Sequence, residues 1–111
     1  MSKDPILERR SVRRFTAQAV EENDVRKLLE AGMAAPSAGN ERPWHFVVIR
    51  DRAALESIMG VHPYAEMLRQ CAGAILVCGD PSLEKYPGFW VQDCSAATEN
   101  VLLMAVQLGL G

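Results

Sequence analysis

The sequence predicts one domain of mixed helix and strand content. Segments with apolar residues at helical spacing alternate with two short runs, 44–50 and 73–80, that are rich in β-branched or other apolar residues. Of the 111 residues, 49% are hydrophobic and 23% are charged, which is the composition of a single globular domain. No repeat, low-complexity tract or linker divides the chain.

Capping signals predict where the first helices begin and end. Asp4 precedes a proline that suits the first helical position, so a short helix is expected there. A second helix is expected from about Glu22 to Ala34, and Pro36 ends it because the residue before a proline is pushed out of the helical region. Its predicted core face is made of four apolar residues at helical spacing: Val25, Leu28, Leu29 and Met33.

Both strands are predicted to be buried on both faces. The run 44–50 (WHFVVIR) shows no polar alternation after His45, and the run 73–80 (GAILVCGD) is apolar almost throughout. Buried strands of this kind need protein on each side of the sheet.

Further helical segments follow these strands. Asp51 caps a short helix that stops at Gly60, and residues 62–70 are expected as a turn and a short helix. Residues 81–88, with two prolines and a glycine, are expected as a loop. The longest helix is expected at 89–108, and its second half is apolar on nearly every side, so protein has to cover it all round.

These elements require more covering residues than the chain supplies, since a two-stranded sheet is marginal even with helices on it. The sequence ends at GLG, a helix-ending glycine that normally leads into another element. We therefore expect residues 1–111 to be the N-terminal part of a longer domain. The alternative is a protein that completes its core with a partner chain.

Charge and cysteine content restrict the partners and the compartment. A net charge of −2 argues against a general nucleic-acid or membrane binder. No secretory signal precedes the first apolar run, and no run is long enough to span a bilayer, so a cytoplasmic protein is expected. Cys71, Cys78 and Cys94 lack C-x-x-C spacing and are expected as small buried residues. No metal site is predicted, because His45 and His62 lie far apart.

The segment ERRSVRRF concentrates positive charge around Ser11: Arg9, Arg10, Arg13 and Arg14. Guanidinium groups this close repel one another, so an acidic chain that carries them is expected to place an anion there. The planar guanidinium fork matches phosphate oxygens, and the serine hydroxyl adds a donor. The alternative is a solvated charged face in which the arginines pair with nearby acids: Glu8, Glu21 and Glu22.

The stretch AAPSAGNERPWHF, residues 34–46, is not expected to hold a hydrolase nucleophile. A nucleophile elbow needs a strand before the serine and a helix after it, whereas here a helix precedes Ser37 and a strand follows. No acid is predicted to orient His45 or His62.

The same loop suits a flat ligand with polar edges. Pro36 is rigid, Ser37 and Asn40 carry short hydrogen-bonding groups, and Gly39 lets the backbone approach closely. The alternative is a capped turn in which Ser37 and Asn40 satisfy neighbouring backbone groups.

Taken together, these segments resemble the nitroreductase family of flavoproteins. RRSVRRF resembles its R-x-S-x-R-x-F motif, and APSAGNERPWHF resembles its A-P-S-x-x-N-x-Q-P-W-x-F loop. WVQDCSAATENVLLMAVQLGLG resembles its central helix, D-x-x-x-A-x-x-N-x-L-L-x-A-x-x-x-G-L-G. The resemblance extends from Ile6 to Gly111, with three motifs in the order and spacing of the family. Arg42 departs from it, since the family more often has glutamine there.

The resemblance implies an α+β, three-layer fold in which helices flank a mixed central sheet, assembled as an intertwined homodimer with FMN at the subunit interface. By motif position, Arg9, Arg10 and Ser11 would hold the phosphate and ribityl chain, and Arg13 would approach the pyrimidine edge. Three loop residues would reach the flavin bound mainly by the other subunit: Pro36, Ser37 and Asn40. The family's C-terminal half, with the segment that embraces the partner, would follow residue 111.

The activity that the resemblance implies is hydride transfer from NAD(P)H through FMN to a small acceptor, such as a nitroaromatic or a quinone. No residue is predicted as a covalent nucleophile or general acid. The alternatives are a specialised flavin enzyme of the same fold, either a reductive dehalogenase or a flavin-fragmenting enzyme, and a non-catalytic flavin-binding fragment.

Overall fold

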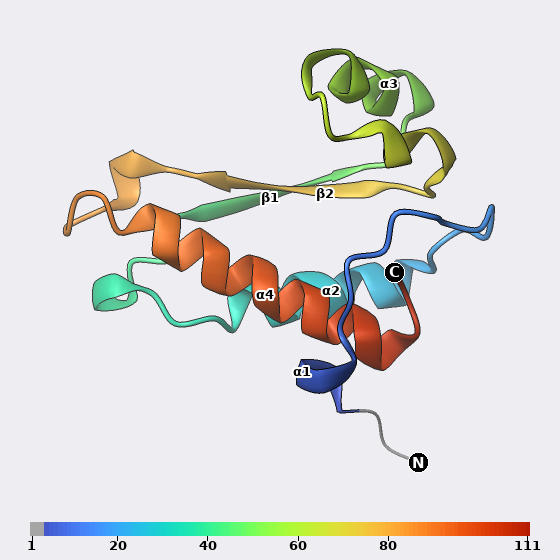
Figure 1. Cartoon of the computed structure of the whole chain (residues 1–111). Helices are drawn as coiled ribbons and strands as arrows, with labels where there is room; N and C mark the ends of the chain where they lie inside the picture. The colour runs from blue at the N-terminus through green and yellow to red at the C-terminus, as the bar shows by residue number, and fades with distance from the viewer. Residues whose placement is uncertain (1–3) are drawn as a thin grey trace.

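Residues 4–111, the part of the chain that the computed structural model describes, follow the predicted order of helices and strands (Figure 1). The elements, with η for short 3-10 helices, are α1 (Pro5–Glu8), α2 (Glu22–Met33), η1 (Ala38–Asn40), β1 (Trp44–Ile49), α3 (Arg52–Val61), η2 (Glu66–Gln70), β2 (Ala74–Gly79), η3 (Pro81–Leu83) and α4 (Trp90–Leu108).

The predicted helix ends at Asp4, Asp51 and Gly109 are confirmed, but Gly60 lies inside α3, which continues to Val61. The Asp4 carboxylate accepts hydrogen bonds from the backbone N–H groups of Ile6 and Leu7, at 3.2 and 3.4 Å. The Asp51 carboxylate accepts one from Ala54 at 3.0 Å at the start of α3. At the other end, Gly109 has φ +73°, the left-handed conformation that ends α4 without the penalty of a side chain.

The core lies between one face of the sheet and α4. Strands β1 and β2 pair antiparallel, with Trp44 opposite Gly79 and Ile49 opposite Ala74. Every second residue of β1 therefore faces α4. The residues that form the core cluster and its partly buried border come from the loop before β1, both strands and α4: Ala35, Trp44, Phe46, Val77, Cys94, Ala96 and Ala97.

The prediction that both strands are buried on both faces is wrong for this part of the chain. Val47 and Leu76 are register partners on the face away from α4, and they are 44% and 49% exposed. The apolar runs suggested two covered faces, but among the described residues α4 packs against only one. The predicted shortage of covering residues is thus present in the structure.

Helix α2 lies alongside α4 on the covered side of the sheet, as Figure 1 shows. Val25 and Leu28 are buried as predicted, but Met33 is 51% exposed, so the predicted core face is wrong at that position. Gly32 is buried instead, because a Cβ there would lie 2.9 Å from the Phe46 ring and 3.1 Å from Val101. The missing side chain lets α2 approach both α4 and the sheet.

Helix α3 lies beyond the other side of the sheet, near the end at which β1 leaves it (Figure 1). The guanidinium of Arg52, at the start of α3, donates hydrogen bonds to the backbone carbonyls of Leu68 and Cys71, each at 2.7 Å, and so joins α3 to η2. Helices therefore flank the sheet, as an α+β fold requires, and within residues 4–111 the sheet is one antiparallel pair. In this part of the chain, no helix is both long and apolar enough to cross a bilayer.

Two glycine-to-alanine substitutions test the close packing of α2. Alanine normally favours a helix over glycine by about 1 kcal/mol. At Gly32 the added methyl group meets the Phe46 ring, so Gly32→Ala should lower the free energy of unfolding by about 1–3 kcal/mol. At Gly60, in α3, nothing lies within 4 Å of the added methyl group, so Gly60→Ala should be neutral or stabilising. Denaturant unfolding of both variants measures the difference, and stabilisation by Gly32→Ala would contradict the packing described.

Candidate functional site

The arginine segment, residues 8–15, contacts α4 at its start. Arg9 Nε lies 3.7 Å from Glu99 Oε1 on α4, and Arg10 donates to the backbone carbonyls of Leu7 and Arg9, each at 2.8 Å. Arg10, Arg13 and Arg14 are exposed, as the alternative of a solvated charged face expects. The ion pairs expected with nearby acids are not found in the described residues, and Glu22 pairs instead with Arg50 at 2.8 Å. The segment is therefore fixed against α4 at its start.

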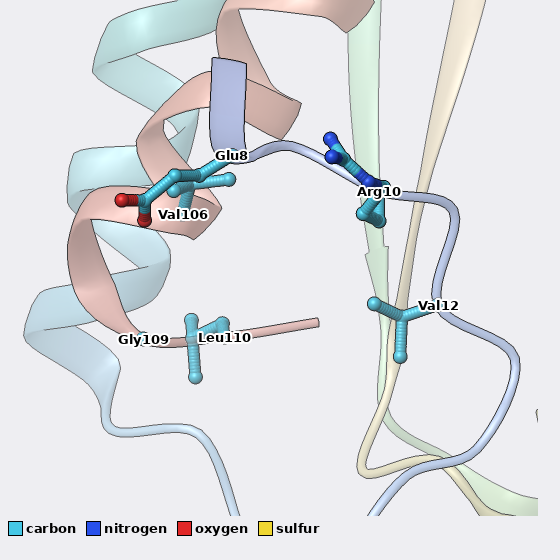
Figure 2. Close-up of a pocket in the computed structure, with 6 residues that line it drawn as sticks. All are labelled: Glu8, Arg10, Val12, Val106, Gly109 and Leu110. Carbon is cyan, nitrogen blue, oxygen red and sulfur yellow. The ribbon is translucent and has the colours of Figure 1, made fainter. Parts of the chain in front are cut away.

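A shallow hollow of about 270 Å³ lies where this segment meets the end of α4. Figure 2 shows that Glu8, Arg10 and Val12 line it from the N-terminal segment. Val106 and Leu110 line it from the end of α4 and the residues after it. The hollow thus combines one guanidinium and one carboxylate with an apolar floor.

Ser11 and Arg13, the other predicted site residues of this segment, are exposed. Neither side chain has a hydrogen bond or ion pair among residues 4–111. Their donors therefore remain available to a ligand.

The second predicted group, in the loop before β1, has an unusual backbone. Gly39, Asn40 and Arg42 have φ values of +58°, +56° and +48°. Glycine and asparagine tolerate this region, but an arginine there costs on the order of 1 kcal/mol. Ser37 Oγ accepts a hydrogen bond from Arg42 N at 2.9 Å, the kind of local contact that the capped-turn alternative expects. The Asn40 side chain has no partner in the described part of the chain.

Two acidic residues that were not predicted hold this loop. Asp93 of α4 accepts a hydrogen bond from Ala38 N at 3.1 Å. Glu41 accepts from the backbone of Lys85 and Tyr86, the latter at 2.7 Å. These contacts join residues more than 40 positions apart, so no local pattern in the sequence could have indicated them.

The structure does not bring the two groups of predicted residues together within one chain. Glu99 contacts the arginine segment and Asp93 contacts the loop, both from α4. Six residues along a helix correspond to about 9 Å of rise and to side chains that point about 120° apart. The arginine segment and the loop therefore lie at different levels and on different sides of α4.

His45 has an orienting acid that was not predicted. Its Nε2 lies 2.8 Å from Asp80 Oδ2, and Asp80 Oδ1 accepts from the Ser82 hydroxyl at 2.5 Å. These hydrogen bonds, the one from Ser82 first, lower the pKa of Asp80. Asp80 stands between the serine and the histidine, so the imidazole does not contact the Ser82 hydroxyl. Among residues 4–111 no histidine contacts Ser37 Oγ, so nothing in the structure supports a hydrolase nucleophile there.

The cysteines and metal-binding residue types define no further site. All three cysteines are free; Cys71 and Cys94 are buried as predicted, whereas Cys78 is only partly buried. Burial, followed by the charge of Asp93, raises the pKa of the Cys94 thiol and so keeps it protonated and unreactive at neutral pH. No group of three or more potential metal ligands occurs within residues 4–111.

Comparison with known proteins identifies relatives along the whole chain. The sequence model described as "Nitroreductase family" matches residues 6–81. A protein of Methanothermobacter thermautotrophicus, provisionally named an NADH dehydrogenase/NAD(P)H nitroreductase, is 53% identical over 115 aligned positions, which cover 100% of this chain and 60% of that protein. A protein of Archaeoglobus fulgidus with the same name is 51% identical, with 96% and 62% covered. The chain thus spans about 60% of the length of these curated relatives.

Solved structures show the same arrangement. The crystal structure of a provisionally assigned NADH oxidase from Clostridium acetobutylicum superimposes with a TM-score of 0.92 at 41% identity, covering 95% of this chain and 63% of the other. A provisionally assigned nitroreductase from Desulfovibrio desulfuricans, solved in complex with FMN, superimposes with a TM-score of 0.85 at 36% identity. It matches 94% of this chain and 61% of its own.

The Asp80 contacts predict a specific dependence of stability on pH. Because folding lowers the pKa of this carboxyl, its contribution is fully present above the ordinary value of 3.8 and is lost as pH falls through the lower folded value. Asp80→Asn should therefore reduce the melting temperature at neutral pH, and the difference from wild type should shrink below about pH 4. Thermal unfolding at several pH values measures this, and a difference that grows toward acid would contradict it.

Proposed function

The chain belongs to the nitroreductase family, and on this premise we propose that it is the N-terminal part of an FMN-dependent oxidoreductase. The proposed reaction transfers hydride from NAD(P)H to a small acceptor such as a nitroaromatic or a quinone. The observation that carries the proposal is the arginine segment: Arg9 contacts α4, while the donors of Ser11 and Arg13 are exposed and open to a ligand.

The donors present fit the chemistry of FMN. The guanidinium groups of Arg9, Arg10 and Arg13 suit a terminal phosphate dianion and an electron-rich ring edge, and the Ser11 hydroxyl suits a phosphate or ribityl oxygen. Within residues 4–111 this group has one acidic partner, Glu99, which forms a partly exposed contact with Arg9. Such surface pairs contribute only about 0–1 kcal/mol, so the pair presents little competition to a phosphate.

In this proposal the segment binds the cofactor in order along the chain. Arg9, Arg10 and Ser11 hold the phosphate and the ribityl chain, and Arg13 lies at the pyrimidine edge of the ring. FMN, when bound, supplies the hydride chemistry. A guanidinium at the pyrimidine edge stabilises negative charge on the ring, an effect worth up to about 3 kcal/mol in a site without water.

The loop is proposed to serve the second site of a homodimer. Pro36, Ser37 and Asn40 would contact the flavin held mainly by the partner, which agrees with the separation of the two groups along α4. Helix α4 also has exposed apolar residues, such as Val91 and Leu102, that suit a subunit contact.

We also propose that the sheet face around Val47 and Leu76 is covered in the complete protein. Residues 1–111 would then form one FMN-binding domain together with the part of the relatives, about 40% of their length, that has no counterpart here. A covered face agrees with the apolar character of both strands.

The complete protein, purified and resupplied with FMN, tests the assignment of the arginine segment. Arg9→Gln combined with Ser11→Ala should weaken FMN binding at least about 30-fold, because it removes a charge-assisted and a neutral hydrogen bond. Arg14→Gln, which changes the net charge equally at a position outside the proposed site, is the matched control and should bind normally. Equal FMN content in the double variant and the wild type would refute the phosphate role.

The same preparation tests the reaction. Wild-type protein should oxidise NADH or NADPH in the presence of a nitroaromatic compound or a quinone, measured by steady-state kinetics. FMN binding without turnover of any such acceptor would favour a specialised flavin enzyme of the same fold or a non-catalytic flavin-binding protein.

A further inference from the structure

The loop from Ser37 to Arg42 cannot hold its conformation by its own sequence alone. Three of these six residues have positive φ, and two of the three carry side chains. Backbone in this region persists only where the surroundings fix it. Internal hydrogen bonds, such as Asn40 N to Ser37 O at 3.0 Å, close the turn but do not fix its place on the domain.

The first external contact comes from α4. Asp93 lies in the first turn of that helix and is 6% exposed, and its Oδ1 accepts from Ala38 N at 3.1 Å. The helix N-terminus favours a negative charge at this position. Because Ala38 is next to Ser37, the contact places the serine relative to α4.

The second contact comes from the segment before α4. Glu41 Oε1 accepts from the N–H groups of Lys85 and Tyr86, so it holds this segment against the loop. The Tyr86 ring then lies directly on Gly39, where a Cβ would come within 2.5 Å of it. Two carboxylates and one aromatic ring therefore clamp the loop at Ala38, Gly39 and Glu41.

We propose that Asp93 and Glu41 are positioning residues, which set the loop so that Ser37 and Asn40 face the flavin. This inference rests on the proposed function. Neither carboxylate needs to touch the cofactor, since each acts through a backbone that it holds.

The second oxygen of each carboxylate indicates that the loop is held by an acceptor oxygen and does not require both carboxylate oxygens. Glu41 Oε2 and Asp93 Oδ2 are buried and have no hydrogen-bond partner in the part of the chain that the structure describes. One oxygen of each group thus accepts the hydrogen bonds that hold the loop. An amide keeps one acceptor oxygen, so asparagine or glutamine should replace the acid, whereas alanine should not.

Hydrogen exchange of the complete protein without FMN tests the clamp itself. Asp93→Ala should accelerate exchange of the Ala38 amide by at least about tenfold, because its acceptor is gone. Asp93→Asn should leave the protection within about threefold of wild type. In the same way, Glu41→Ala should expose the amides of Lys85 and Tyr86, and Glu41→Gln should protect them. Unchanged exchange in both alanine variants would overturn the clamp.

FMN titration of the same variants tests the positioning role. The alanine variants should bind FMN about tenfold more weakly and shift the visible absorption band of bound flavin, and the amide variants should restore both. Faster exchange with unchanged FMN affinity and spectrum would overturn the positioning role.

Glu84→Ala is the matched control for stability. Glu84 accepts from Trp90 N at 2.9 Å and from Gly88 N at 3.4 Å, so it secures the start of α4 and has no hydrogen bond to residues 37–42. Its loss should lower the melting temperature but leave FMN affinity within about twofold, as expected for a helix cap alone. A wild-type protein that binds no FMN would refute the proposed function itself, whereas wild-type binding with unaltered alanine variants would refute only the positioning role.

Discussion

The close approach of α4 to α2 and to one face of the sheet is the constraint on which the rest of the structure depends. It is possible because small residues lie at the contacts: Ala97 is fully buried, and Gly32 leaves room for the Phe46 ring. Asn100 of α4 secures the pair by donating to the Ala31 carbonyl at 2.9 Å. A helix placed in this way presents Asp93 to the loop and Glu99 to the arginine segment. One element therefore positions both groups of proposed cofactor-binding residues.

Short sequence patterns predicted the helices and strands because a cap, a terminal glycine or an apolar run acts on its own neighbours in the chain. Caps and a terminal glycine fixed the helix ends at Asp4, Asp51 and Gly109, and apolar runs fixed both strands. The degree of burial was not predictable in this way, because the exposure of Val47 and Leu76 depends on which elements cover each face. The same holds for Gly32, whose burial follows from the crossing of α2 with α4 rather than from helical spacing.

The candidate site also combines residues that the sequence predicted with residues that only the fold shows. Motif resemblance assigned residues to a cofactor, and their donors are exposed or held by few contacts. The residues that support them could not be predicted from the sequence, because Asp93 and Glu41 accept hydrogen bonds from backbone N–H groups 55 and 45 positions away. An acid in a helix or a loop ordinarily indicates a solvated surface, and only the fold shows that these two carboxylates hold a strained turn in place.

The central claim is that one flavin site takes the arginine segment from one chain and the loop from another. Mixed dimers test it directly: one subunit carries Arg9→Gln with Ser11→Ala, its partner carries Ser37→Ala with Asn40→Ala, and different affinity tags isolate the heterodimer of complete chains. One of its two sites then contains only unaltered residues. The account predicts one tightly bound FMN per heterodimer, while both parent homodimers bind weakly. A heterodimer that binds as weakly as its parents would show that both groups act within a single chain and would contradict the account.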